Sequence, residues 1–193
     1  MVKISKGNRK IGKVWNVSLT PIISCPDGVP CTKDCYAMKA YRQYPSTRKA
    51  WDHNLRAYLS DGEAYFDSIS DQLERYAGEV FRWHVAGDIV DQKYLNGMVE
   101  VAYYHHDIKF LAFTKNYYLN FDDMPNNLIV IMSAWPGRVL PAKARAFPIA
   151  WLSHDERIDD VAIDPVECEE MCEACGMKCF KLDRLIDIVF TQH

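Results

Sequence analysis

Seven cysteines are the residues of this chain best suited to chemistry, and they fall into two groups. The first group has the spacing C-x5-C-x3-C and consists of Cys25, Cys31 and Cys35. The second group has the spacing C-x3-C-x2-C-x3-C and consists of Cys168, Cys172, Cys175 and Cys179. Residues 36–167 contain no cysteine. Because cysteines that only fill a core would not segregate in this way, both groups predict metal binding.

Three thiols in one turn-rich loop leave one ligand position of a metal site unfilled. Structural zinc usually takes four ligands, commonly in pairs with short spacing, and the first group lacks that pattern. A four-iron four-sulfur cluster held by three thiolates keeps one iron open to a small chelating ligand. We therefore expect a site-open 4Fe–4S cluster on Cys25, Cys31 and Cys35. The alternatives are a zinc ion completed by a nearby His or Asp, and unligated thiols.

The four thiols of the second group suffice to close the coordination of either a zinc ion or a cubane. Gly176 allows the chain to turn sharply between ligands, and Lys178 and Lys181 can offset thiolate charge. The spacing thus predicts a metal-binding segment at residues 165–181 without deciding between iron–sulfur and zinc. Unligated thiols are the remaining alternative.

Between the two groups the sequence alternates strand and helix patterns. Strands are expected within 13–24, 79–87, 108–114, 127–133 and 146–152. Helices are expected at 46–59, 63–77 and 91–106. Residues 117–123 read as a short helical or irregular crossover, and 185–191 as a further strand or part of a helix. The pattern predicts a single α/β domain over residues 1–193, either a compact partial (β/α) barrel or an open parallel sheet.

Sites in parallel α/β folds lie beyond the carboxyl ends of the strands. In this sequence those ends are the loops that begin at Ser24, Gly87, Lys115, Ser133 and Ser153. The first cysteine group follows the first of these strand ends. We therefore expect the other loops to supply its neighbours.

Four residues of these loops are candidate ligand-binding residues. Gly87 permits close backbone approach, and the Asp88 carboxylate can accept a hydrogen bond from an ammonium group, unless Asp88 or Asp91 caps the following helix. Lys115 can meet a carboxylate or phosphate, or lie solvated at its strand end. Ser133, with Trp135 beyond it, can contact a ribose or an adenine face, although Trp135 can equally pack beside its turn. His84, by contrast, is expected to be a core histidine.

The charge of the chain bears on its partners. A formal net charge of −3 argues against a protein whose entire surface binds nucleic acid. The basic arm, residues 1–13, nevertheless carries five cations and no acid: Lys3, Lys6, Arg9, Lys10 and Lys13. We expect a solvated, flexible start to the chain, with nucleic-acid binding by the basic arm as the alternative.

No segment of the sequence approaches the roughly 20 apolar residues of a membrane span, and no N-terminal apolar stretch resembles a signal peptide. We therefore expect a cytoplasmic protein that has no membrane partner. In that compartment the cysteines are not expected to form a disulfide framework.

Several motifs in order resemble one bacteriophage family, known only as gene product eighty-eight. They are the cysteine loop that ends Cys-Tyr-Ala, the segments RWHVAGD, FTKN and NLIVIMSAWPG, and the terminal cysteine group, between Asn16 and Phe180. The resemblance implies a phage protein that acts in the bacterial host cell, without implying an established reaction. This family in turn distantly resembles the radical S-adenosylmethionine enzymes.

That second resemblance implies a radical S-adenosylmethionine-like fold and roles for the residues above. Cys25, Cys31 and Cys35 would hold a cubane whose open iron binds the methionyl amino and carboxylate groups of S-adenosylmethionine. Ala86-Gly87-Asp88 stands where those enzymes have a turn that receives the methionyl ammonium, and Asp88 and Lys115 would orient this end. One electron would then cleave the sulfonium and release an adenosyl radical. Two alternatives stay open: a non-catalytic iron–sulfur module for redox or host interaction, and a zinc-stabilised nucleic-acid-binding protein.

Overall fold

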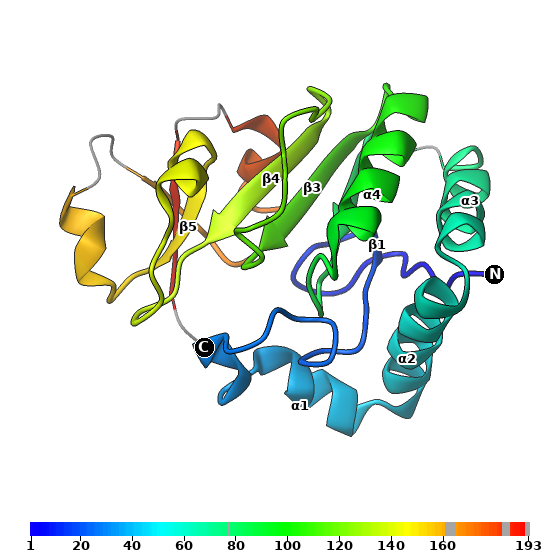
Figure 1. Ribbon diagram of the computed structural model, residues 1–193, viewed down its shortest axis with the longest axis horizontal. Helices are drawn as coiled ribbons and strands as arrows, with labels where there is room; N and C mark the ends of the chain where they lie inside the picture. Colours follow the sequence, from blue (N-terminus) through cyan, green and yellow to red (C-terminus); the bar gives the residue numbers. More distant parts are fainter. Residues whose placement is uncertain (77, 161–164, 183–185, 192–193) are drawn as a thin grey trace.

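The structure, a computed structural model, describes residues 1–76, 78–160, 165–182 and 186–191. These residues form one sheet of seven parallel strands in the order β1-β2-β3-β4-β5-β7-β6 (Figure 1). The strands are β1 (Trp15–Val17), β2 (Val80–Trp83), β3 (Lys109–Thr114), β4 (Leu128–Ser133), β5 (Ile149–Leu152), β6 (Val166–Glu167) and β7 (Ile188–Phe190). The sheet is open, because β1 and β6 are its two edges.

Four α-helices accompany the sheet in the described residues: α1 (Tyr36–Gln43), α2 (Pro45–Ser60), α3 (Gly62–Leu73) and α4 (Gln92–Tyr104). Short 3-10 helices lie at Pro30–Thr32, Ala142–Ala146, Glu156–Asp160 and Lys178–Lys181. The carboxylate of Asp61 caps α3 by accepting a hydrogen bond from Ala64 N at 3.0 Å, and Asp91 caps α4 through Tyr94 N at 2.7 Å. These caps satisfy amides that have no partner within the helix.

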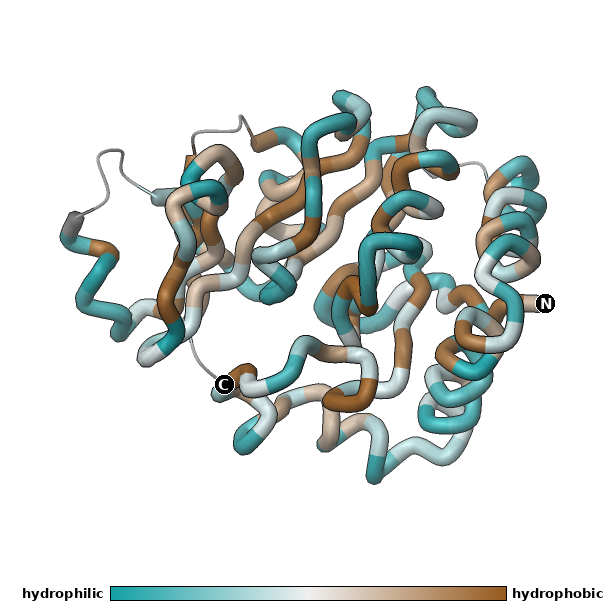
Figure 2. Tube along the Cα trace, viewed as in Figure 1, coloured by the Kyte–Doolittle hydropathy of each residue, from teal (hydrophilic) through white to brown (hydrophobic). Residues whose placement is uncertain are grey.

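Strands β1 to β5 lie next to one another in chain order. Right-handed crossovers between strands in this order all pass over the same face of the sheet. Accordingly α4 lies along β3, with α3 beside α4 and α2 beyond it (Figure 1). The larger apolar cluster fills this side and includes Phe81, Trp83 and Phe110 of the strands with Phe66 and Met98 of the helices. In Figure 2, hydrophobic residues follow β3 and β4 through the centre, whereas hydrophilic residues predominate on α2.

The opposite face of the sheet is covered by the two ends of the chain. A smaller apolar cluster there joins four strand residues to residues near each terminus: Leu111, Ile131, Ala150 and Ile188 to Ile11, Val14 and Phe180. Cys168, Cys172 and Cys179 pack against the same cluster. The non-alternating apolar runs of β3 and β4 are thus explained, because both faces of these strands are covered. The C-terminal cysteine segment, residues 165–181, is part of this second core layer.

The basic arm, residues 1–13, packs onto the rest of the chain, so the expectation of a flexible start is wrong, although its five cations are exposed as expected. Val2 is 3% exposed, and its backbone N–H donates a hydrogen bond to Ser68 Oγ at 2.9 Å. Lys3 exchanges hydrogen bonds with the Asn54 side chain at 2.8 and 3.0 Å, and Ser5 pairs with Asn16 in an antiparallel bridge. Apolar residues of the arm, such as Val2 and Ile11, hold it in place.

Most predicted elements are present with shifted ends. The helices expected at 46–59, 63–77 and 91–106 correspond to α2, α3 and α4, and residue 77 lies outside the described residues. The strands expected within 79–87, 108–114, 127–133 and 146–152 correspond to β2, β3, β4 and β5. Residues 117–123 are irregular, and 185–191 contains β7, with residue 185 outside the described residues. Helix α1 and strand β6 were not expected. Among the described helices, none combines the length and apolarity of a membrane span.

Candidate metal and ligand site

The first cysteine group lies in the loop after β1, and this loop is tied to the loop after β2. Ser18 Oγ accepts hydrogen bonds from Val85 N at 3.1 Å and Ala86 N at 3.3 Å. Leu19 N donates to Ala86 O at 3.0 Å. The cysteine loop therefore starts at the carboxyl edge of the sheet, where the strand order predicts a site.

Gly87 is a second point at which these two loops pack closely. Its φ is +87°, and a Cβ on Gly87 would lie 2.5 Å from Ser24 Oγ and 2.9 Å from Leu19 Cβ. Ser24 is itself fixed, because its hydroxyl donates to Thr20 O at 2.7 Å. Close approach at Gly87 is therefore required by the packing of one loop on the other.

The three thiols of the first group are half-buried and share one electrostatic environment. Burial raises the pKa of Cys25 to about 12, with further increases from the charges of Asp88, Cys31 and Cys35. Burial also raises the pKa of Cys31, and the nearby Lys115 ammonium opposes that rise. Without a metal, Cys25 and Cys31 stay protonated near neutral pH, so a metal must displace their protons.

Asp88 connects the ends of β2 and β3. It is 4% exposed, and its Oδ1 accepts hydrogen bonds from Thr114 Oγ1 at 2.6 Å and Ile89 N at 2.7 Å. Its Oδ2 accepts one from Lys115 N at 2.9 Å. Burial raises the pKa of Asp88, against the opposing effects of Lys115 and of these hydrogen bonds. Of the two aspartates considered as helix caps, it is Asp91 that caps α4.

Lys115 and Ser133 lie at neighbouring strand ends. The Lys115 ammonium lies over the Trp135 ring at 5.7 Å from its centre. Ser133 is buried, and its carbonyl accepts a hydrogen bond from the Tyr117 hydroxyl. The ring of Tyr117 also carries the Arg138 guanidinium, 4.9 Å from its centre. Lys115 thus acts on Cys31 of the cysteine loop, and Arg138 lies next to Lys115, donating a hydrogen bond to its carbonyl at 3.0 Å.

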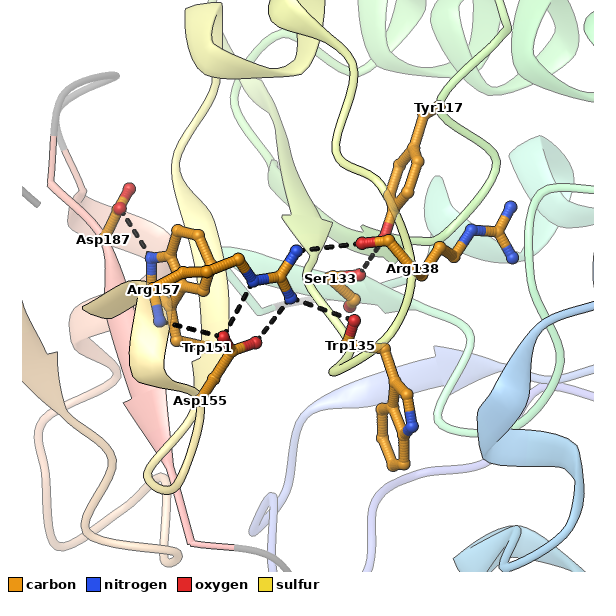
Figure 3. Close-up of polar contacts among 8 residues, drawn as sticks. All are labelled: Tyr117, Ser133, Trp135, Arg138, Trp151, Asp155, Arg157 and Asp187. Carbon is orange, nitrogen blue, oxygen red and sulfur yellow. Dashed lines mark hydrogen bonds and ion pairs between the residues drawn. The ribbon is translucent and has the colours of Figure 1, made fainter. Parts of the chain in front are cut away.

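An ion pair beyond β5 supports the loop that carries Trp135 and Arg138 (Figure 3). Arg157 binds the buried Asp155 carboxylate through Nε at 2.8 Å and through Nη2 at 2.5 Å. The same guanidinium donates to Arg138 O at 2.8 Å and Trp135 O at 2.9 Å. Asp155 and Arg157 therefore hold the backbone of this loop through the carbonyls of Trp135 and Arg138.

The second cysteine group is held by the basic arm. Cys172 N donates to Lys10 O at 2.9 Å, and Lys13 N donates to Glu173 Oε1 at 3.3 Å. Burial raises the pKa of Cys179 to about 12, with a further increase from Cys168 and an opposing effect of Arg82. Lys178 forms an ion pair with Glu169 at 2.7 Å, and its charge also interacts with Cys175.

Within the described residues, no three His, Cys, Asp or Glu side chains are grouped so that they would hold a metal ion. Both metal sites therefore stay predictions. A family model described as Gene product 88 matches residues 2–180. This chain belongs to the Gene product 88 family. No curated protein and no solved structure matches the chain.

The part of the chain that matches Gene product 88 contains both cysteine groups and the residues around them. The structure brings Asp88 and Lys115 to the first cysteine group, and Gly87 and Ser133 to the adjoining loops. Sequence reasoning missed Arg138 and Arg157. A cation two residues after a buried acid, as in Asp155-x-Arg157, is the signal that would have indicated the supporting ion pair.

Proposed function

We propose that this member of the Gene product 88 family is an iron–sulfur protein with a site-open cubane on Cys25, Cys31 and Cys35. A second metal centre would lie on Cys168, Cys172, Cys175 and Cys179. The proposal depends chiefly on one observation: hydrogen bonds and close packing join the first cysteine loop to the loop that carries Asp88, which in turn binds the backbone of Lys115 at the next strand end.

The donor set of the first group fits such a cluster. Thiolates are the ligands that select iron–sulfur clusters and zinc over harder ions. All three thiols are half-buried, which leaves access for an inorganic cluster and a ligand. Lys115 offsets part of the negative charge that three thiolates would bring.

The surrounding residues suit a ligand that carries both charges. Oδ2 of Asp88 accepts a single hydrogen bond, so it retains a lone pair for an ammonium donor. Lys115 offers a cation for a carboxylate beside it. An amino acid moiety, such as the methionyl end of S-adenosylmethionine, has this pair of groups. When bound, a reduced cubane would supply the electron that cleaves the sulfonium of that cofactor.

Anaerobic purification with iron, sulfide and zinc analysis tests the metal. We expect a brown protein with about four iron atoms per cluster. Replacing Cys25, Cys31 and Cys35 together by Ser should remove the first centre only, and the same change at the second group should remove the second only. A colourless protein with stoichiometric zinc would contradict the first site.

Addition of S-adenosylmethionine to the reduced protein tests the open iron. We expect a changed electron paramagnetic resonance spectrum and release of 5′-deoxyadenosine, both absent from the variant without the first three cysteines. Clusters that show neither response would favour the non-catalytic iron–sulfur module. The alternative of nucleic-acid binding predicts zinc together with an affinity that falls steeply with salt.

A further inference from the structure

Positive charge collects on helices α1 and α2 and on the turn before them, which we call the basic helical segment, residues 33–56. Its cations, all of them exposed, are Lys33, Lys39, Arg42, Arg48, Lys49 and Arg56. These six cations stand against two acids, in a chain whose formal net charge is −3. The next helix has the opposite character, because residues 61–74 hold five acids and no cation. The positive charge is therefore confined to two neighbouring helices.

None of the six cations is paired with an acid in the part of the chain that the structure describes. The ion pairs there join Arg157 to Asp155 and Lys178 to Glu169. Helix α3 packs against α2, yet its acids form no ion pair with the basic helical segment within the same described residues. The six positive charges thus stay available to an outside partner.

The acids of the basic helical segment itself offset only part of this charge. Asp52 is half-buried, and its Oδ1 accepts hydrogen bonds from Thr20 Oγ1 and Tyr41 Oη, both at 2.8 Å. The ring of Tyr41 also stacks on Trp51, with 6.3 Å between the ring centres, which fixes α1 against α2. Asp34 is the other acid, and it is exposed. The cations therefore lie on two fixed helices, which follow one another along one margin of the molecule (Figure 1).

A pocket of about 550 Å³ lies at the α1 end of the basic helical segment. Three of the six cations line it against a single acid, and the side chains of Ile22 and Met38 add apolar surface. Cys35 of the first cysteine group lines the same pocket. Cations beside apolar walls suit a phosphate group and the base attached to it.

Two tyrosine rings are exposed among these cations. Tyr36 begins α1 and is 64% exposed, and Tyr44 joins α1 to α2 and is 51% exposed. The hydroxyl of Tyr36 is bound to the Val85 carbonyl, so Tyr44 presents the freer ring. Proteins that bind single-stranded nucleic acid combine a positively charged groove with aromatic rings on which bases stack. Unpaired bases can reach such rings, whereas the bases of a duplex are already stacked on one another.

We infer that the basic helical segment binds single-stranded nucleic acid, with its cations on the phosphates and Tyr44 against a base. The phosphates account for the unpaired cations, and the bases account for the exposed ring and the apolar walls of the pocket. This inference goes beyond the proposed function and needs no bound metal. It also differs from binding by the basic arm, because the cations in question belong to α1 and α2.

The test titrates the full chain into a labelled oligothymidylate of about 20 nucleotides, longer than one binding site, and follows fluorescence anisotropy at several salt concentrations. One variant combines Lys39→Gln, Arg42→Gln and Lys49→Gln. We expect it to bind at least about tenfold more weakly than the parent. The slope of log affinity against log salt should become shallower by about 2, because each phosphate contact on a single strand contributes about 0.7.

The basic arm supplies the matched control. Lys6→Gln, Arg9→Gln and Lys10→Gln together remove the same types of exposed cation and lower the net charge equally, so they should change the affinity by less than about twofold.

Two further variants separate charge, stacking and folding. The charge-conserving combination of Lys39→Arg, Arg42→Lys and Lys49→Arg should keep the affinity and the salt slope of the parent. Tyr44→Leu should weaken binding about fivefold or more without changing the salt slope, because it removes a stacking face and no charge. Urea unfolding of each variant verifies that the fold is intact.

Three results would overturn the inference. One is an equal loss of affinity in the two Gln variants, which would indicate a response to net charge alone. Another is tighter binding of a duplex of the same length. The third is binding of polyglutamate without binding of the oligothymidylate, which would assign the basic helical segment to an acidic protein. A colourless protein that binds the oligothymidylate would contradict only the iron–sulfur proposal, and a brown protein that does not bind it would contradict only this inference.

Discussion

Gly87 and Ser24 approach so closely that a Cβ on Gly87 would lie 2.5 Å from Ser24 Oγ. The contact joins the loop after β2 to the start of the cysteine loop. Neither partner can easily move away, because Ser24 Oγ donates a hydrogen bond to Thr20 O and the backbone of Gly87 has a φ of +87°. The position of the first cysteine group relative to Asp88 therefore depends on glycine at position 87, which has no side chain.

Gly87→Ala is expected to lower the free energy of unfolding by about 2–4 kcal/mol. About 1 kcal/mol comes from the left-handed backbone, and the rest from displacing Ser24 and Leu19. Gly137→Ala is the matched control, because Gly137 has a φ of +78° with nothing within 4 Å of its added Cβ. Urea unfolding of both variants measures the difference. Equal losses would show that the loops can separate without cost.

Asp88→Asn is expected to cost about 1–3 kcal/mol, because the amide that replaces Oδ2 would face the N–H of Lys115. Asp91→Asn is the control. Asp91 accepts both of its hydrogen bonds, from Tyr94 N and Tyr58 Oη, through Oδ1, and Asn caps helices as well as Asp does. Thermal or urea unfolding should therefore show a much smaller loss for Asp91→Asn. If Asp88→Asn were as stable as the parent, the idea that Asp88 joins the ends of β2 and β3 would be contradicted.

The strand ends were predictable from sequence, and with them the neighbourhood of the first cysteine group. Runs such as Leu128–Met132 are apolar enough to indicate covered strands, and the polar residue after each run indicates where it ends. Lys115 could be located in this way, because it directly follows the run that ends at Thr114. Parallel pairing then brings these ends to one edge of the sheet.

Other features depend on contacts between residues far apart in the sequence. The basic arm looked like a charged tail, yet Val2 and Ile11 are buried by segments that no local pattern relates to them. Helix α1 is short, and it begins directly after Cys35 without a side-chain cap. The burial of Arg82 Nε was also hidden, because β2 reads as an ordinary strand until the C-terminal segment covers its second face.

Arg157→Lys is expected to destabilise the loop that carries Trp135 and Arg138 by about 1–3 kcal/mol. A lysine cannot reproduce the fork that binds Asp155 and two backbone carbonyls at once. Lys178→Ala is the control, because its ion pair with Glu169 is exposed on both sides and should contribute little. Urea unfolding compares the two. Similar, small losses would mean that the loop does not depend on Arg157.

His84 is a buried histidine in a left-handed conformation, with a φ of 55° and an exposed fraction of 3%. Its Nε2 lies 3.0 Å from the Tyr94 hydroxyl, and its Nδ1 is buried without a partner. Burial, and then the charge of Arg82, lowers the pKa of His84 to about 3. The folded protein therefore holds this imidazole neutral, as expected for a core histidine.

His84→Asn is expected to flatten the loss of stability between about pH 6 and pH 4. In the parent, unfolding lets His84 take up a proton below its unfolded pKa of about 6.5. Its contribution to stability is thus complete above that pH and is lost as the pH falls toward 3, by up to about 1.4 kcal/mol per pH unit. Asn tolerates the left-handed backbone. Urea unfolding across this range measures the slope, and His106→Asn, which removes an exposed histidine, should keep the parent slope. If the free energy of unfolding of His84→Asn falls with pH as steeply as that of the parent, the buried imidazole is not the group that takes up the proton.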